Sequence, residues 1–184
     1  KNKGAKMYRM LMIIFSCFSL SFAGTLWLGL GTSPTASYDG CMTDMGSTIC
    51  DSDDVDLDDG GLEIGYTHML KQDGKMGWGL GGSYHIAGMG EDGFEAQFLT
   101  LYGIGTYGLS ESMGAWFALG LGLPQGDIDD GDTGMAYSLG LMYNLNEKMM
   151  LGLGYTVNNS SLSDPDGDFD WEFSRMTLNF GYRM

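Results

Sequence analysis

The sequence contains little proline, little cysteine and little positive charge. Its 184 residues include 3 prolines, 3 cysteines and 9 lysines and arginines, against 24 acidic residues. The net charge of -15 argues against nucleic acid as a partner, because a phosphate backbone would be repelled. Charged residues are only 18% of the chain and aromatic residues are 12%. This is the composition of a packed protein and not of a disordered one.

Long apolar runs are also lacking, apart from one near the start of the chain. That run follows four basic residues and ends in Ser21-Phe22-Ala23. It is short for a membrane-spanning helix, which needs about 20 apolar residues, but it is typical of a secretory signal peptide. We therefore predict a signal peptide over residues 1–23 and one exported domain over residues 24–184.

Glycine is abundant, with 31 residues, and it recurs in segments whose side chains alternate between large apolar and small or polar. The last segment shows this pattern most clearly. One face carries Met176, Leu178, Phe180, Tyr182 and Met184, and the other carries Arg175, Thr177, Asn179, Gly181 and Arg183. A period of two indicates a β-strand. Its apolar face fits lipid outside a barrel, with the glycine and polar face inside.

Similar alternation recurs along the whole of the exported domain. Further strands are predicted to begin near Thr25, Leu62, Met76, Phe94, Met113, Ala136 and Met150. Short turns at 71–75, 110–112 and 146–148 alternate with long loops at 33–60, 89–93, 124–133 and 159–170. Since an open sheet edge is not tolerated in hydrocarbon, we predict an all-β fold, an eight-stranded antiparallel up-and-down transmembrane β-barrel.

The interior of so narrow a barrel is predicted to need small residues. Trp27 and Trp116 are expected to face inward, so glycines should lie beside them. The strand from Phe94 has the least clear faces, and we orient it by placing its two polar residues away from lipid. This leaves Ala96, Phe98, Tyr102 and Ile104 outside. Six tyrosines are expected as interfacial or lipid-facing anchors, namely Tyr66, Tyr84, Tyr102, Tyr143, Tyr155 and Tyr182.

A polar cluster is predicted inside the barrel, in the loop-side half of the strands. Its members are Glu63, His85, Glu95, Gln97 and Arg175. Arg175 is expected to pair with Glu63 or Glu95, because an unpaired arginine in a dry lumen would be very costly. We expect the cluster to act as a plug that fixes the barrel, with a gate or small pore as the alternative.

Two cysteines remain after the signal peptide. Cys41 and Cys50 are expected to form a disulfide in an oxidising compartment. A metal site would need more nitrogen or sulfur ligands than this stretch offers.

Most of the acidic residues lie in the predicted long loops, while Lys71, Lys75 and Lys148 lie in the short turns. One rim should therefore be strongly acidic and the other mildly basic. No cofactor is predicted, because neither acidic run fits a twelve-residue calcium loop; Ca2+ or Mg2+ binding at these carboxylates is the alternative to a solvated surface. The carboxylates concerned are Asp51, Asp53, Asp54, Asp56, Asp58, Asp59, Asp164, Asp166, Asp168 and Asp170.

These features together resemble the small eight-stranded outer-membrane barrels, such as the OmpA transmembrane domain, OmpX and the opacity proteins. The resemblance implies a location in the outer membrane of a Gram-negative bacterium, in contact with its lipid. It also implies that Phe180, Tyr182 and Met184 form the assembly signal read by the outer-membrane insertion machinery. Members of the family usually end on an aromatic residue, and Met184 departs from that.

The expected function is a structural or surface-interaction role, in adhesion or envelope integrity, through acidic extracellular loops that meet a surface ligand or host cell. A narrow pore like the OmpW-like barrels is the first alternative. A lipid A-modifying enzyme would need Ser83, His85 and Glu95 together, and the His-x-Ser motif of outer-membrane deacylases is absent. We therefore predict no catalytic residue and no enzymatic activity. A soluble lipocalin-like carrier would need the leucine face inside.

Overall fold

The computed structural model describes residues 24–44, 47–91, 94–164 and 167–184. The predicted signal peptide lies outside these residues. Within them the chain forms one antiparallel sheet, and no helix there is long and apolar enough to cross a membrane. The strands are β1 (Gly24–Asp44), β2 (Ser47–Asp56), β3 (Leu62–Asp73), β4 (Met76–Ala87), β5 (Met89–Glu91), β6 (Phe94–Gly108), β7 (Met113–Gly126), β8 (Asp132–Asn144), β9 (Met149–Asp164) and β10 (Gly167–Arg183).

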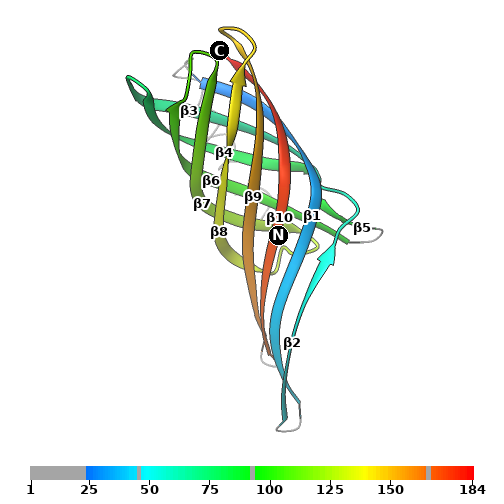
Figure 1. Ribbon diagram of the computed structural model, residues 1–184. Coiled ribbons are helices and arrows are strands. Elements are labelled where there is room, and N and C mark those ends of the chain that lie inside the picture. The colour runs from blue at the N-terminus through cyan, green and yellow to red at the C-terminus, as the bar shows by residue number, and fades with distance from the viewer. Residues whose placement is uncertain (1–23, 45–46, 92–93, 165–166) are drawn as a thin grey trace, which may run out of the picture.

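The sheet closes on itself, because β1 pairs with β10 as well as with β3. The closed ring runs β1, β3, β4, β6, β7, β8, β9 and β10, and each strand pairs with the next in an antiparallel register. Strands β2 and β5 lie outside the ring and pair with β1 and β6 (Figure 1). The predicted eight-stranded up-and-down barrel is therefore confirmed.

The outer surface of the barrel is an apolar belt. On β7, Leu119 and Leu121 are 46% and 55% exposed, whereas Ala118, which points into the barrel, is 5% exposed. The same sidedness holds on the other strands of the ring. Exposed members of the belt include Leu28, Leu30, Trp78, Leu80, Leu101, Phe117, Leu139, Leu141, Leu153, Leu178 and Phe180. So large an apolar surface belongs in lipid, as the sequence pattern predicts.

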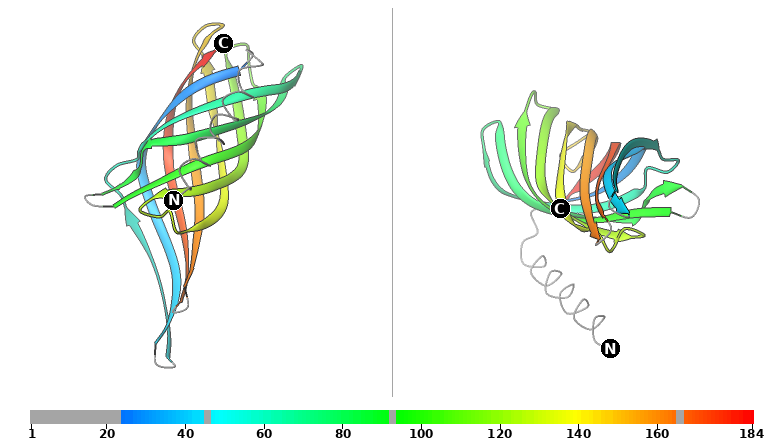
Figure 2. Two further views of the ribbon diagram at one scale, coloured as in Figure 1. Left: turned by 180° about the vertical axis from the view of Figure 1, so that it is seen from behind. Right: turned by 90° about the horizontal axis from the view of Figure 1, so that it is seen from below.

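Three of the predicted long loops contain strands, and the shortest of them, residues 89–93, includes β5. Residues 33–60 and 159–170 are largely strand, because β1 continues to Asp44 and pairs with β2, and β9 and β10 continue to their shared tip. Ser33 has a positive φ of 49°, and the register shifts between Thr32 and Thr35. A β-bulge here re-aims the strand as it leaves the barrel. Figures 1 and 2 show both hairpins reaching far beyond the rim, on the end opposite the C-terminus.

The predicted faces of β6 are wrong. Ala96 and Phe98 are buried at 0% and 1% exposure, and Tyr102 lies inside the barrel, while Glu95 is exposed. The prediction assumed that Glu95 would otherwise meet lipid. The structure places it beyond the apolar belt, where its backbone N–H donates to Asp127 in the neighbouring loop at 2.8 Å. Because the Glu95 carboxylate is hydrated there, it does not have to point into the barrel. The apolar residues of β6 therefore decide which face of the strand points inward.

Glycines lie directly across from the bulky inward side chains, as predicted. Trp27 pairs with Gly65, Tyr102 with Gly81 and Trp116 with Gly140. A Cβ at any of these glycines would overlap the ring opposite. Each aromatic ring therefore packs on the backbone of a glycine in the neighbouring strand, where no side chain is in the way.

The structure joins Cys41 to Cys50 by a disulfide, with the sulfurs 2.06 Å apart, as a directly opposed pair on β1 and β2. We expect Cys41→Ser/Cys50→Ser to leave the barrel folded and to speed proteolysis of the β1–β2 hairpin. The bond constrains only a short loop beyond the rim, so its loss should weaken the hairpin by about 2 to 3 kcal/mol. Limited proteolysis, followed by the heat-modified mobility of the barrel, checks this. Loss of the folded mobility would contradict a merely local role.

Candidate functional site

The lumen is divided into a filled half and an open half. The filled half lies on the side of the long hairpins and holds an apolar core that we call the plug, composed of Ala36, Met89, Ala96, Phe98 and Phe173. Phe98 meets Phe173 edge to face with 5.6 Å between ring centroids, and Phe173 stacks on Trp171 at 6.1 Å. The plug comes from β1, β5, β6 and β10, so several strands fix it at once.

A buried ion pair lies beside the plug. Arg175 on β10 donates from Nη2 to the Glu63 carboxylate on β3 at 2.9 Å, and its side chain is 1% exposed. Its Nη1 donates to the Met89 sulfur at 3.0 Å. Charges this deep require both partners, because either one alone would lie uncompensated in a dry interior. Arg175 therefore links β10 to β3 through Glu63 and to β5 through Met89.

His85 lies next to this pair and is 1% exposed. It is directly opposite Glu63 in the β3–β4 register. Its Nδ1 accepts the backbone N–H of Phe98 at 2.8 Å, so the imidazole carries its hydrogen on Nε2 in the neutral form. This bond satisfies a backbone donor of β6 at the level of the plug. The contact supports a structural role for His85.

Of the predicted polar cluster, the structure brings together Glu63, His85 and Arg175. The other two, Glu95 and Gln97, lie on the outer surface, and their predicted inward placement is wrong for the reason given above. Gln97 donates to the Glu95 carboxylate at 3.0 Å, and Glu95 also accepts the backbone N–H of Gly88. Glu95 therefore supports the rim and cannot orient His85.

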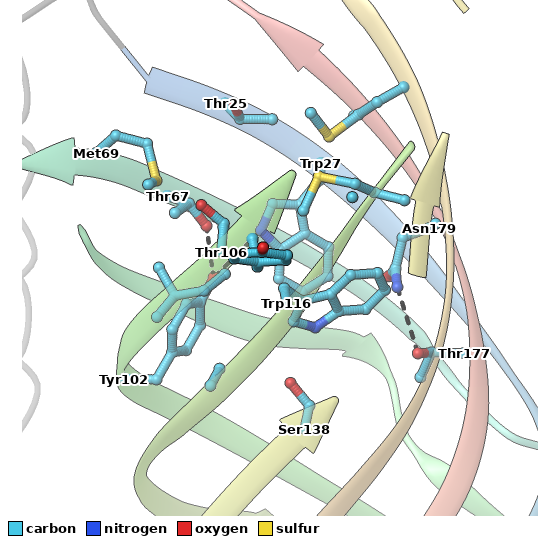
Figure 3. A pocket seen from close by; sticks show the side chains of 18 of the residues that line it. Thr25, Trp27, Thr67, Met69, Tyr102, Thr106, Trp116, Ser138, Thr177 and Asn179 are labelled. Atoms are coloured by element: carbon cyan, nitrogen blue, oxygen red, sulfur yellow. Dashed lines mark hydrogen bonds between the residues drawn. The ribbon is translucent and has the colours of Figure 1, made fainter. Parts of the chain in front are cut away.

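The open half of the lumen is a cavity of about 550 Å³ on the side of the short turns. Trp27, Tyr102 and Trp116 line it (Figure 3), and it reaches the turn residues Lys75 and Glu111. The Trp27 indole N–H donates to the Tyr102 hydroxyl at 3.2 Å. The Tyr102 hydroxyl in turn lies 2.9 Å from the Thr67 hydroxyl. The cavity is therefore amphipathic, with ring faces and hydroxyl groups on its wall.

A polar ring separates the cavity from the plug. It consists of Glu63, Ser83, Thr100, Asn158 and Thr177, all buried and all lining the inner end of the cavity. Thr100 donates to Oδ1 of Asn158 at 3.4 Å. Asn158 Nδ2 has no hydrogen-bond partner among the described residues. This atom is the one donor of the ring that the described chain leaves unsatisfied.

The carboxylates predicted as a cation site are dispersed. Asp51 and Asp53 lie on one face of β2 and Asp54 and Asp56 on the other, since neighbouring strand residues point to opposite sides. Asp59 instead accepts the backbone N–H of Gly61. No group of three or more ligating side chains suited to a metal is found in the described part of the chain. Asp58 and Asp170 are exposed, and the side chains of Asp164, Asp166 and Asp168 lie outside the described ones.

The C-terminal residues predicted as an assembly signal lie on the lipid-facing side of the last strand. Phe180, Tyr182 and Met184 are 40%, 42% and 55% exposed. The backbone N–H of Met184 donates to the carbonyl of Gly24 at 2.9 Å, which joins the two ends of the domain at the closing seam. Recognition by the insertion machinery stays a prediction.

Several residues that shape the lumen were missed by the sequence analysis. Met89 was placed in a loop, Phe98 and Tyr102 were placed outside, and Asn158 was not considered. Threonine at 100 and 106 gives a signal that could have oriented β6, because these hydroxyls alternate with Leu99 and Leu101. Met89 gives no such signal, because a segment of three residues is too short for any pattern.

Comparison with known proteins gives the fold and no closer relationship. No protein-family model matches the sequence, and neither does any curated protein. The outer-membrane protease OmpT from Escherichia coli matches with a TM-score of 0.51 and 10% identity, over 90% of this chain and 99% of that one. The Yersinia pestis protein Ail in a nanodisc has a TM-score of 0.49 at 17% identity, over 89% of this chain and 100% of that one. OprG from Pseudomonas aeruginosa has a TM-score of 0.47 at 14% identity, over 88% and 96%. The chain therefore has the fold of the outer-membrane β-barrels of Gram-negative bacteria.

Proposed function

We propose that this protein is a surface-interaction protein, anchored in the outer membrane by its barrel, that binds basic surfaces outside the cell through its two long hairpins. The part that we call the extension comprises residues 35–44, 47–56, 158–164 and 167–173. The observation that carries the proposal is the length of β1. It has 21 residues, whereas crossing the bilayer takes about 9 to 11.

The extension is a sheet and not a set of loose loops. The outer half of β1 pairs with β2 on one side and with β10 on the other, and β10 pairs with β9. Tyr38 and Trp171 lie opposite each other on β1 and β10, with ring centroids 5.5 Å apart. Paired backbones and packed rings hold the extension away from the rim. Its surface is therefore presented in a fixed shape.

The extension carries negative charge without compensation. Its sequence contains no lysine or arginine, and Asp39 lies directly opposite Asp170 in the β1–β10 register. The Asp51 carboxylate raises the pKa of the Tyr38 phenol above its ordinary value. Asp53, Asp170 and Trp171 line one groove in this surface. Carboxylates beside half-buried aromatic rings suit lysine and arginine side chains.

A pore is the alternative function, and the plug argues against it. Phe98 and Phe173 fill the lumen on the hairpin side, and the buried Arg175–Glu63 pair lies beside them, joining β10 to β3. We expect planar bilayers containing the protein to show no large, stable single-channel conductance. Such a conductance would overturn the plug and favour passage of small molecules.

Catalysis forms no part of the function that we propose. A hydrolytic site would need Glu95 beside His85, and these side chains lie on opposite faces of the wall. A serine-directed probe is expected to leave Ser83 unlabelled. Labelling of Ser83 would reopen the lipid-modifying alternative.

The binding proposal is tested with the barrel in lipid nanodiscs and a ten-residue lysine peptide as the probe. We expect Asp53→Asn/Asp54→Asn/Asp170→Asn to weaken binding about tenfold or more at low salt, because three charges are lost from the extension. The matched control is Asp73→Asn/Glu111→Gln/Glu147→Gln, which removes three charges at the short-turn end. Equal weakening by the two triple variants would contradict the proposal, as would binding that neither changes.

A further inference from the structure

The cavity on the short-turn side of the lumen is shaped to hold a molecule. Eight strands enclose a space that side chains can fill or that one small ligand can occupy. This barrel fills only the hairpin-side half, and it leaves about 550 Å³ at the other. That volume lies within the range of small-molecule sites, roughly 300 to 1,000 Å³.

The wall of the cavity is built to keep its centre open. Trp27, Tyr102 and Trp116 would fill the bore if they pointed across it. Instead each lies over a glycine on the neighbouring strand, and a Cβ at that glycine would overlap the ring. The rings are thereby held against the wall, and Figure 3 shows all three around the cavity. Flat aromatic walls around a narrow space suit a planar apolar body.

The inner end of the cavity offers a hydrogen-bond donor. Asn158 is 1% exposed and lines the cavity, and its Nδ2 is unpartnered among the described residues. Leaving such a donor buried and unpaired costs about 1 to 3 kcal/mol. An acceptor oxygen on a molecule in the cavity would remove that cost. The nearby Glu63 carboxylate is already paired with Arg175, so the inner end of the cavity has no unpaired charge that would favour a charged ligand.

We propose that this cavity is a binding site, entered from the periplasmic side, for a small neutral molecule with a planar apolar body and a carbonyl oxygen at its inner end. The body lies between Trp27 and Trp116, and the carbonyl accepts from Asn158 Nδ2. Entry is from the periplasm because the cavity reaches the short turns, which face that side in barrels of this fold. The plug closes the other end.

The test uses acetophenone and ethylbenzene, which differ in the carbonyl group. Both are titrated into the protein in lipid nanodiscs, and the indole N–H resonances of Trp27 and Trp116 and the amide of Asn158 are followed by NMR. Saturable shifts are expected, with acetophenone binding about three- to tenfold more tightly, which is the worth of one neutral hydrogen bond. Asn158→Leu should abolish this preference and retain binding of ethylbenzene.

A matched pair of variants on β8 separates the cavity from the lipid. Ser138 lines the cavity, and its neighbour Leu139 is 50% exposed on the outer face. Ser138→Trp should abolish the saturable shifts, and Leu139→Trp should leave them unchanged. Thr106→Trp, which also fills the cavity, replaces Ser138→Trp if that variant does not fold. Shifts that do not saturate, or equal affinity for the two probes, would refute the site.

Discussion

Replacing Arg175 by methionine is expected to destabilise the barrel by about 3 to 5 kcal/mol. The substitution keeps much of the side-chain volume but removes the partner of Glu63, which lies 2.9 Å from the guanidinium and is nearly buried. Breaking a buried pair from one side leaves an uncompensated charge, and this is far more costly than losing a surface pair. Urea unfolding of the barrel in lipid vesicles, followed by the mobility of folded and unfolded forms, measures the loss.

Two further variants show whether the charge is the cause. Glu63→Gln combined with Arg175→Met removes both charges and should recover much of the lost stability. Lys71→Met breaks an exposed pair, in which Lys71 Nζ and the Asp73 carboxylate are 3.6 Å apart, and should change stability by less than about 1 kcal/mol. If the double variant is as unstable as Arg175→Met alone, packing around the guanidinium and not charge holds the plug.

The membrane-facing side of the fold could be predicted from the sequence because lipid imposes one simple rule. Every strand within the bilayer must turn its large apolar residues outward and close its backbone hydrogen bonds. On β10, Leu178 is exposed and Thr177 is buried, as the alternation predicts. The same rule predicts the inward and outward faces of most strands in the ring. Strand order follows, because short turns join neighbouring strands.

The rule gives no information beyond the bilayer. The outer half of β1 has no lipid on either side, so Tyr38 and Asp39 alternate without an apolar face, and the segment looked like a loop. The same limit reversed β6, where Glu95 was assumed to be within reach of lipid. Glu95 lies at the rim instead, in contact with Gly88 and Asp127, and the sequence does not show where along β6 the bilayer ends.

The inside of the barrel was predicted in part. Arg175 could be assigned an acidic partner because a buried cation needs one. A plug was expected from the polar cluster, but its apolar core could not be foreseen, since Met89, Phe98 and Phe173 come from three strands and meet only after closure. The cavity was equally hidden. The sequence shows that glycines accompany Trp27 and Trp116, but only the register shows that each ring covers its own glycine.

The β1–β3 register, which places Gly65 opposite Trp27, also predicts a large loss of stability for Gly65→Leu. A side chain at Gly65 would enter the space of the Trp27 indole directly opposite. The ring is held by its bond to the Tyr102 hydroxyl at 3.2 Å, so relief requires breaking that bond or moving the strands. Overpacking of this kind costs about 1 to 3 kcal/mol and sometimes more, and we expect the upper end or failure to fold.

A second substitution, at Trp27, tests whether the indole causes the loss of stability in Gly65→Leu. Trp27→Ala alone should cost about 3 kcal/mol or more through the space that it leaves, whereas Trp27→Ala combined with Gly65→Leu should be more stable than either single variant, because the new side chain fills the vacated wall. Gly105→Leu is the matched control, since a Cβ there has its nearest heavy atom, the Phe117 carbonyl oxygen, 4.0 Å away. It should leave the urea midpoint unchanged. Additive losses in the double variant would mean that Trp27 does not lie over Gly65, and the flat aromatic wall of the cavity would fall with that contact.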